Sequence, residues 1–566
     1  MTSTPRRPRR GADWPTRLVV VAIVAILGLL IIYPLAAIFV QAFGPSGAGT
    51  MRAIFTSPVN RQIITNTLVL GVLVGALGTA VGFLLAYVQV RVDFKGKKLL
   101  HMLCLLPVVS PPFAVATAVI TLFGRRGIIT EGVLGLETNI YGLPGLTIVL
   151  VLSFFPVAYM NFRGMLMALD PALDEASANL GGNRWQTFWK VTIPMLVPGF
   201  AAAFLLLFVE AIADLANPLV IGGDYFVLAS RAYIAITGEY DIGAGSAYSI
   251  VLLVPAILVF LVQRFWVSRK SAVSVTGKPA GKPKLITSAA GRIPLVAFGV
   301  VMGIIVGGIY LTVIIGAFVK ILGVNNEFTL DNFAYVLSGI GNKSIVDTTV
   351  LALIATPIAG FLGMVIAWLV VRKLKRGNAL LDFLGMLGLA VPGTVVGIGY
   401  AIAFNNPLIV GNRMFFPALG GGAAILGGAV AIVMVYTIRS IPAGQRAGIA
   451  ALQQIDPSID EAAASLGASS TTTFRTVTLP LIRPALLSGL IYAFARSMTT
   501  LSPIIFITTP QTQIMTKQIL AEVDAGRFGN AFAFCTLLLV IVLAVMGLLT
   551  LLVGKNQRAE LGGAAA

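Results

Sequence analysis

Long apolar runs alternate with short polar segments along the whole of this chain. Each run is long enough to form a helix that crosses about 30 Å of hydrocarbon, which takes about 20 residues. The pattern therefore predicts an all-α polytopic membrane protein with two halves of six helices, about 12 transmembrane helices in all. The predicted spans lie near 18–43, 63–90, 99–123, 145–166, 199–222 and 246–267, and near 293–319, 344–371, 380–404, 422–442, 485–508 and 529–554.

Basic residues orient these spans. Clusters at 91–98 and 372–376 sit between apolar runs, and such clusters recur on alternate sides of successive spans. Cytosolic loops of membrane proteins carry an excess of Lys and Arg, so we expect both termini to be cytosolic. A linker rich in Gly, Pro, Ser and Lys at 268–292 separates a first half, 1–267, from a second half, 293–566.

The composition argues against a soluble protein, a nucleic-acid-binding protein and a protein with cysteine-based sites. Hydrophobic residues make up 57% of the chain and charged residues 11%, which is too little charge to cover a soluble protein of 566 residues. The net charge of +18 is spread over short clusters between spans, without the solvated basic patch that nucleic acid requires, so we expect no nucleic-acid partner. Cys104 and Cys535 both lie in apolar spans, which argues against a disulfide framework or a cysteine metal site.

Two polar islands interrupt the apolar pattern and repeat each other. The first, at 173–199, reads LDEASANLGGNRWQTFWKVTIPMLVPG, and the second, at 459–485, reads IDEAAASLGASSTTTFRTVTLPLIRPA. Their matched residues share an offset of 286 positions (460 − 174), whereas LLAYVQVR and VIAWLVVR, which end at Arg91 and Arg372, share an offset of 281 (372 − 91). Because polar identities match as well as apolar ones, we expect two parallel repeats, with about five inserted residues between the matched blocks.

Each island has the start and stop signals of a short helix. Asp-Pro, at Asp170 and Asp456, suits an N-cap followed by the first helical residue. Gly181 and Gly467 then supply a helix stop, and a second amphipathic stretch leads to the next span. We expect a helix, a sharp turn and a second short helix on the cytosolic face. Small side chains after the acidic pair favour a helix seated in the groove of a partner, and a helix lying on lipid head groups is the alternative.

The islands resemble the EAA loop, which marks permease subunits of bacterial binding-protein-dependent ABC importers. The second island fits the Glu-Ala-Ala, Gly and aliphatic-Pro pattern fully, and the first has one Ser for Ala. The resemblance covers nearly the whole chain and implies the type I permease fold, with coupling loops at about 168–198 and 447–484 that seat in the ATP-hydrolysing subunits. The coupling residues that it implies are Asp174, Glu175, Ala176, Gly181 and Pro194, and Asp460, Glu461, Ala462, Gly467 and Pro480.

The resemblance also implies partners. The chain has no G-x-x-x-x-G-K-[ST] sequence and so no loop to hold ATP phosphates, which places ATP and Mg on two separate ATP-binding cassette subunits. The non-cytosolic loops are too short for a substrate-binding domain, so a separate soluble binding protein is expected. We predict a transport subunit that is not an enzyme, binds no cofactor itself, and lies in the bacterial cytoplasmic membrane.

Charged residues within the spans are candidates for the translocation pathway. Glu210 and Asp214 lie four positions apart, on one face of the predicted helix, and the 286 offset aligns Glu210 with Arg496. A charge inside a bilayer costs about 2.5–3.5 kcal/mol on insertion scales, so it usually faces a bundle interior or a water-filled path. We expect Glu210 and Arg496 to lie at or close to an ion pair near the pseudo-two-fold axis, either as a lock between the halves or as part of the pathway.

Oxygen-bearing side chains next to this pair indicate a hard cation as cargo. Asp214 and Asn217 are the stronger pathway candidates, and Glu210 with Asp214 are the candidate metal ligands. The segment at 217–233, NPLVIGGDYFVLASRAY, resembles that of ferric-iron importer permeases, which implies Fe(III), free or chelated. A thiamine, phosphonate or sulfate-type importer stays open. A secondary transporter with twelve helices also stays open, although it would not need two matched docking helices.

Proline-containing segments occur at matched places in both halves. PVVSPP at 107–112 aligns with Val391-Pro392-Gly393. A helix broken at both places would line the path, since freed backbone groups need a cavity or protein cover, and a plain proline kink is the alternative. The single histidine, His101, is expected at the membrane interface rather than in a proton relay. An intramembrane enzyme would need a convergent set of nucleophilic or metal-binding residues, and the sequence shows no such set.

Overall fold

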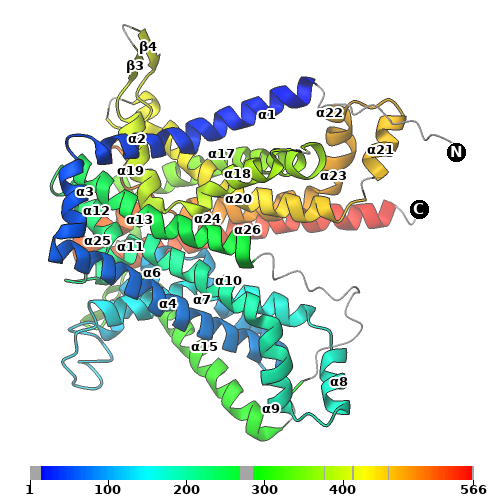
Figure 1. The fold of residues 1–566 in the computed structure, drawn as a ribbon. Coiled ribbons are helices and arrows are strands. Elements are labelled where there is room, and N and C mark those ends of the chain that lie inside the picture. Colours follow the sequence, from blue (N-terminus) through cyan, green and yellow to red (C-terminus); the bar gives the residue numbers. More distant parts are fainter. Residues whose placement is uncertain are drawn as a thin grey trace, which may run out of the picture.

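The computed structural model describes residues 14–267, 285–286, 288–374, 376–410, 413–422, 424–456 and 458–563. Within these ranges the chain is mostly helical, and its long helices run side by side as one bundle (Figure 1). By length and composition, nine helices can cross a membrane, and three bent helix pairs raise the number of candidate spans to 12. Each predicted span overlaps one of these, which confirms the all-α polytopic fold.

The first half contains all helices up to α13, and π-helical turns at Gly28–Ile32, Phe188–Thr192 and Gln263–Val267 extend three of its spans. Its helices are α1 (Trp14–Leu27), α2 (Tyr33–Phe43), α3 (Ala48–Thr56), α4 (Pro58–Arg91), α5 (Lys97–Val109), α6 (Pro112–Phe123), α7 (Leu143–Ala168), α8 (Ala172–Asn179), α9 (Arg184–Thr187), α10 (Ile193–Ala213), α11 (Ala216–Ile221), α12 (Leu228–Thr237) and α13 (Ile242–Val262).

The second half repeats this order and adds two small antiparallel hairpins, β1 (Val319–Ile321) with β2 (Asn325–Phe328) and β3 (Leu408–Val410) with β4 (Arg413–Phe416). Its helices are α15 (Ala289–Ala317), α16 (Asp331–Val336), α17 (Gly339–Trp368), α18 (Asn378–Ala390), α19 (Gly393–Phe404), α20 (Ala429–Gln453), α21 (Ser458–Ser465), α22 (Ser470–Thr473), α23 (Leu479–Leu481), α24 (Arg483–Thr499), α25 (Met515–Asp524) and α26 (Phe528–Gly563).

The helix boundaries repeat the two offsets found in the sequence. α4 and α17 start at positions 58 and 339, which are 281 apart, and the same offset relates α5 to α18 and α6 to α19. α7 and α20 start at 143 and 429, which are 286 apart, and that offset also relates α8 to α21, α9 to α22 and α13 to α26. The additional residues of the second half therefore lie between α19 and α20, in the segment that carries β3 and β4.

Both islands lie at the same end of the bundle. α8 and α9 of the first half and α21 and α22 of the second stand at the right of Figure 1, where α1 begins and α26 ends. The opposite end carries α3, α12, α25 and the hairpin of β3 and β4 (Figure 1). This placement meets the geometric requirement for a pair of docking helices on one face.

Glycines allow the central helices of each half to approach closely. α4 packs on α7, and α17 packs on α20 in the same way. A Cβ atom on Gly82 would lie 2.5 Å from the Cβ of Ala158, and one on Gly363, the counterpart at offset 281, would lie 2.7 Å from the backbone nitrogen of Gln445. Tight packing of small residues is a main source of helix association in lipid, so these contacts hold each half together.

Gly82→Val is expected to lower the melting temperature of the detergent-solubilised protein, because overpacking a tight helix contact costs about 1–3 kcal/mol. Thermal unfolding followed by intrinsic fluorescence measures the change. Gly164→Val on α7 is the matched control, since a Cβ atom there meets nothing within 4 Å. Equal melting temperatures for the two variants would contradict the packing argument.

The structure corrects three predicted boundaries. The span predicted at 199–222 ends at Ala213, because Asp214 takes an extended conformation and α11 follows as a separate helix. The span predicted at 485–508 ends at Thr499, the equivalent position at offset 286. The predicted linker ends earlier than 292, because α15 begins at Ala289, and most of that linker (268–284 and 287) lies outside the described residues.

Candidate functional site

The first island has the predicted form of helix, turn and second helix. The Asp170 carboxylate accepts a hydrogen bond from the backbone N–H of Ala172 (2.9 Å), which satisfies one of the free amides at the start of α8. Gly181 has φ +79°, a left-handed conformation that ends this helix. Asn183 then caps α9 in a capping box with Gln186.

The second island repeats the same local structure. The Asp456 carboxylate accepts a hydrogen bond from the backbone N–H of Ser458 (2.8 Å), and Gly467 has φ +82°. Hydrogen bonds from Ser458 hold the pKa of Asp456 below its usual value, so this cap is ionised at neutral pH and is lost only as the pH falls through that lowered pKa. Asp460 and Glu461 fall in α21, but their side chains lie outside the described part of the chain.

Two arginines attach these regions to the bundle, one at the end of α4 and one in the π-helical turn Leu369–Lys373 that follows α17. The Asp174 carboxylate of α8 forms an ion pair with Arg91, and the two side chains are only 12% and 9% exposed. Arg372, the counterpart of Arg91 at offset 281, donates to the carbonyls of Leu452 and Ile455 just before the second island (3.0 and 2.5 Å). The alignment of the two halves matched Arg91 with Arg372, but the sequence alone assigned these arginines no role.

The outer surface of the islands is apolar at matched positions. Leu180 and Leu466, which differ by the 286 offset, are each 89% exposed. The two halves thus expose the same large apolar side chain at the same place of each island. Sequence reasoning missed these leucines, and the repeated Leu-Gly pair was the available signal. The predicted coupling residues exposed beside them are Glu175, Ala176, Gly181 and Pro194, and Ala462, Gly467 and Pro480.

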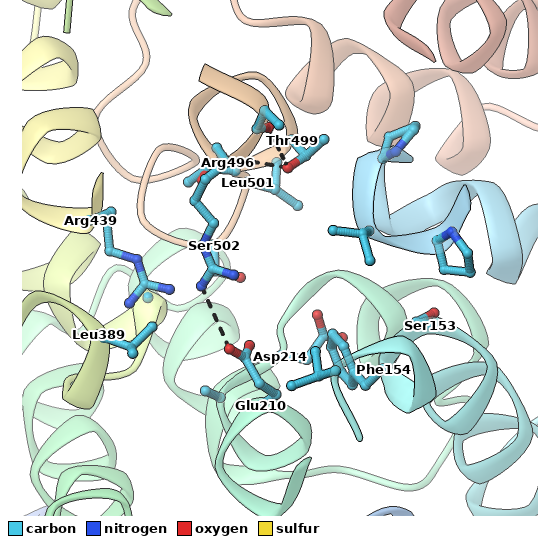
Figure 2. A pocket seen from close by; sticks show the side chains of 18 of the residues that line it. Ser153, Phe154, Glu210, Asp214, Leu389, Arg439, Arg496, Thr499, Leu501 and Ser502 are labelled. Carbon is cyan, nitrogen blue, oxygen red and sulfur yellow. Dashed lines mark hydrogen bonds and ion pairs between the residues drawn. The ribbon is translucent and has the colours of Figure 1, made fainter. Parts of the chain in front are cut away.

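A cavity of about 280 Å³ lies between the two halves. It is lined at the breaks between α5 and α6 and between α18 and α19, and by α7, α10, α20 and α24. All four predicted pathway residues, Glu210, Asp214, Asn217 and Arg496, line it. Figure 2 shows that side chains from both halves point into this one space.

Glu210 and Arg496 face each other across the cavity. The Arg496 guanidinium lies 3.8 Å from the Glu210 carboxylate, and the two side chains are 23% and 27% exposed (Figure 2). The ion pair joins α10 to α24 at equivalent positions of the two halves. The structure thus has the arrangement predicted from the offset.

The sequence predicted that Asp214 and Glu210 share one helix face. This prediction is wrong, because α10 ends at Ala213, before Asp214. Instead, its carboxylate accepts hydrogen bonds from the backbone N–H and the side-chain amide of Asn217 (both 2.9 Å), which favours the break before α11. Both side chains are buried. Among the described residues, no group of three or more His, Cys, Asp or Glu side chains could hold a metal ion, so Glu210 and Asp214 are two carboxylates without a third.

Broken helices form part of the cavity wall in both halves. α5 and α6 meet at 109° and α18 and α19 at 98°, so these are breaks rather than shallow proline kinks. Arg439 donates to the carbonyls of Gly388 and Val391 (3.0 and 2.9 Å), which the second break frees. Sequence reasoning missed Arg439, although an arginine inside the span predicted at 422–442 was a signal for it.

His101 lies off the cavity. Its Nδ1 atom is 2.6 Å from the hydroxyl of Tyr159, which is fully buried on α7. The histidine does not line the cavity, so the geometry gives no support to a proton relay through it.

Comparisons with known proteins agree with this architecture. The family model described as "Binding-protein-dependent transport system inner membrane component" matches the chain twice, at 78–272 and 359–558. The ferric transport system permease protein FbpB of Actinobacillus pleuropneumoniae is 34% identical over 95% of this chain and 78% of its own length. The putative ferric transport system permease protein FbpB 1 of Haemophilus influenzae is 36% identical over 87% of this chain and 78% of its own. The sulfate transport system permease protein CysW of Synechococcus elongatus is 29% identical over 38% of this chain and 78% of its own.

Proposed function

This chain belongs to the family of inner membrane components of binding-protein-dependent transport systems, and from that premise we propose that it imports ferric iron as the fused permease of an ATP-driven transporter. The single observation that carries the proposal is the similarity over 95% of the chain to a permease named for ferric transport. The cavity between the two halves supports transport, because polar and charged side chains, Glu210, Asp214 and Asn217 among them, line it inside the bundle.

The proposed partners are two ATP-binding cassette subunits and a soluble binding protein. The chain carries no phosphate-binding G-x-x-x-x-G-K-[ST] sequence, so ATP and Mg belong to the partners. The cassette subunits would seat on the two islands, where Leu180 and Leu466 are exposed at one end of the bundle. In this orientation the islands and both described chain ends face the cytosol of a bacterial cell.

The proposed mechanism is alternating access at the cavity between the halves. ATP binding draws the cassette subunits together and moves the islands that rest on them. The ion pair of Asp174 with Arg91 passes this displacement of α8 to α4, which packs on α7 and α10. α7 and α10 both line the cavity, so movement at the islands changes access to Glu210 and Asp214.

The test is uptake of radioactive iron by the complete transporter. This chain, co-purified with the cassette and binding proteins encoded beside it, is reconstituted in liposomes with the ferric form of the binding protein outside. We expect iron uptake that requires internal ATP and stops when the phosphate-binding lysine of the cassette subunit is replaced. Uptake without ATP would indicate a secondary transporter. Uptake of sulfate, thiamine or a phosphonate in place of iron would overturn the proposed cargo.

A further inference from the structure

The two walls of the cavity carry opposite charges, although the helices that form them are repeats. At offset 286, Glu210 on α10 corresponds to Arg496 on α24. On α7 and α20, Ser153 corresponds to Arg439, and Met160 corresponds to Arg446. All three arginines line the cavity, and all three belong to the second half. The basic wall is therefore a feature of the second half alone and is not required by the repeated fold.

Arg439 has bonding capacity that the described residues do not fill. One nitrogen, Nη1, serves the freed carbonyls of Gly388 and Val391. Its buried Nε atom has no hydrogen-bond partner among the described residues. Figure 2 shows the guanidinium groups of Arg439 and Arg496 directed toward the same space. Like charges that converge in a low-dielectric site repel each other unless anions compensate them. The Glu210 carboxylate lies beside Arg496 and compensates one charge, but Arg439 and Arg446 line the same cavity, so the excess of positive charge favours a bound anion.

Arg446 extends the basic wall along α20. It lies seven residues after Arg439, about 10 Å further along the helix toward the islands. Its side chain is exposed and lines the cavity, and no described residue lies within ion-pair distance of it. An arginine that is open to the cavity and has no ion-pair partner among the described residues is available to hold a passing ligand.

The balance of charges is unfavourable for a bare trivalent cation. Three guanidinium groups face two carboxylates, of which Glu210 already lies beside Arg496 and Asp214 is held by Asn217. Hard cations without other ligands are bound by several carboxylates, a set that the described residues do not offer here. Guanidinium groups instead match the planar, bidentate geometry of carboxylate and phosphate oxygens.

We propose that this cavity binds an oxyanion of the phosphate or carboxylate class at the basic wall formed by Arg439, Arg446 and Arg496, and that the cargo crosses together with it. This inference rests on the proposed function and specifies the chemical form of the cargo. The oxyanion is either a ligand of the ferric ion or a free anion that accompanies it. In both cases the positive charge of the metal is compensated before it meets the basic wall.

The test is dual-label uptake by the reconstituted transporter with its cassette subunits and binding protein. Ferric iron is supplied with labelled inorganic phosphate in one arm and with labelled citrate in the other. We expect anion and iron to enter in a fixed ratio. A ligand of the metal enters only when it was loaded with iron on the binding protein, whereas an accompanying anion also enters when it is added separately. Iron uptake with neither anion entering overturns the proposal and leaves the proposed function intact.

Arg446→Gln separates binding from folding, because this side chain makes no bond to the described protein. We expect it to raise the concentration of phosphate or citrate that gives half-maximal iron uptake by about tenfold or more, the effect of losing one charged hydrogen-bonding partner. Arg439→Gln, which also frees two carbonyls, is expected to lower thermal stability in addition. Lys343→Gln, an exposed lysine at the start of α17, is the matched control and is expected to change neither quantity. An unchanged anion dependence in Arg446→Gln would refute the site.

Discussion

Asp174→Ala is expected to lower ATP-driven uptake by the complete transporter at least about tenfold, while the cassette subunits continue to hydrolyse ATP. The substitution removes the ion pair that ties α8 to the end of α4, where both side chains are nearly buried. Breaking a buried ion pair costs about 3–5 kcal/mol, and a factor of ten corresponds to about 1.4 kcal/mol. Uptake and ATP hydrolysis are measured on the same proteoliposomes, so that a loss of coupling is seen as a change in their ratio.

Two further variants separate coupling from a general loss of structure. Asp170→Ala removes only the cap of the same helix, at a cost of about 1 kcal/mol, and should reduce uptake far less. The exchange of charges in Arg91→Asp with Asp174→Arg should restore part of the uptake that Asp174→Ala loses. If Asp174→Ala transports normally, or if ATP hydrolysis falls in step with uptake, the ion pair does not transmit the movement of the island.

Arg496→Leu is expected to reduce iron uptake by about a hundredfold and to lower the amount of folded protein in the membrane. It leaves the Glu210 carboxylate without the guanidinium that now lies 3.8 Å away, inside the bundle. An uncompensated charge at this depth costs about 2.5–3.5 kcal/mol on insertion scales, which converts to roughly a hundredfold in an equilibrium. Uptake in proteoliposomes and the yield of monodisperse protein after extraction report the two effects separately.

A neutral pair decides between the two roles of this contact. The double variant Glu210→Gln with Arg496→Gln removes both charges. If the ion pair only holds the two halves together, this variant should recover both folding and transport. We expect yield and melting temperature to recover while uptake stays low, because the pair also belongs to the pathway. Lys320→Gln, which breaks an ion pair on the exposed β1–β2 hairpin, is the control for stability. Full recovery of uptake in the neutral pair would assign a structural role only.

The sequence was sufficient for the features that depend on periodicity and repetition. Spans follow from runs of about 20 apolar residues, and the islands follow from Asp and Gly signals that act within a few residues of themselves. The contact of Glu210 with Arg496 was predictable because one offset relates the two helices that carry them. A duplicated chain contains its own alignment, and that alignment places residues in space without any homologue.

Other features depend on contacts that no local pattern reveals. The end of α10 at Ala213 is fixed by two hydrogen bonds between Asp214 and Asn217, within a stretch that reads as one apolar run. Arg91 and Asp174 are 83 positions apart and belong to different segments, so no spacing rule relates them. The role of Arg439 at the second helix break requires knowledge of which carbonyls are freed there.

The charge difference between the cavity walls gives a reason for the halves to remain one polypeptide. Two identical six-helix subunits related by a two-fold axis would set Glu210 against a second glutamate, or Arg496 against a second arginine. Two distinct subunits made separately could also assemble in these like-charged combinations. Covalent linkage makes every assembled pore contain one acidic and one basic partner in a one-to-one ratio, so the pairing is determined when the chain is synthesised rather than by mutual recognition in the membrane.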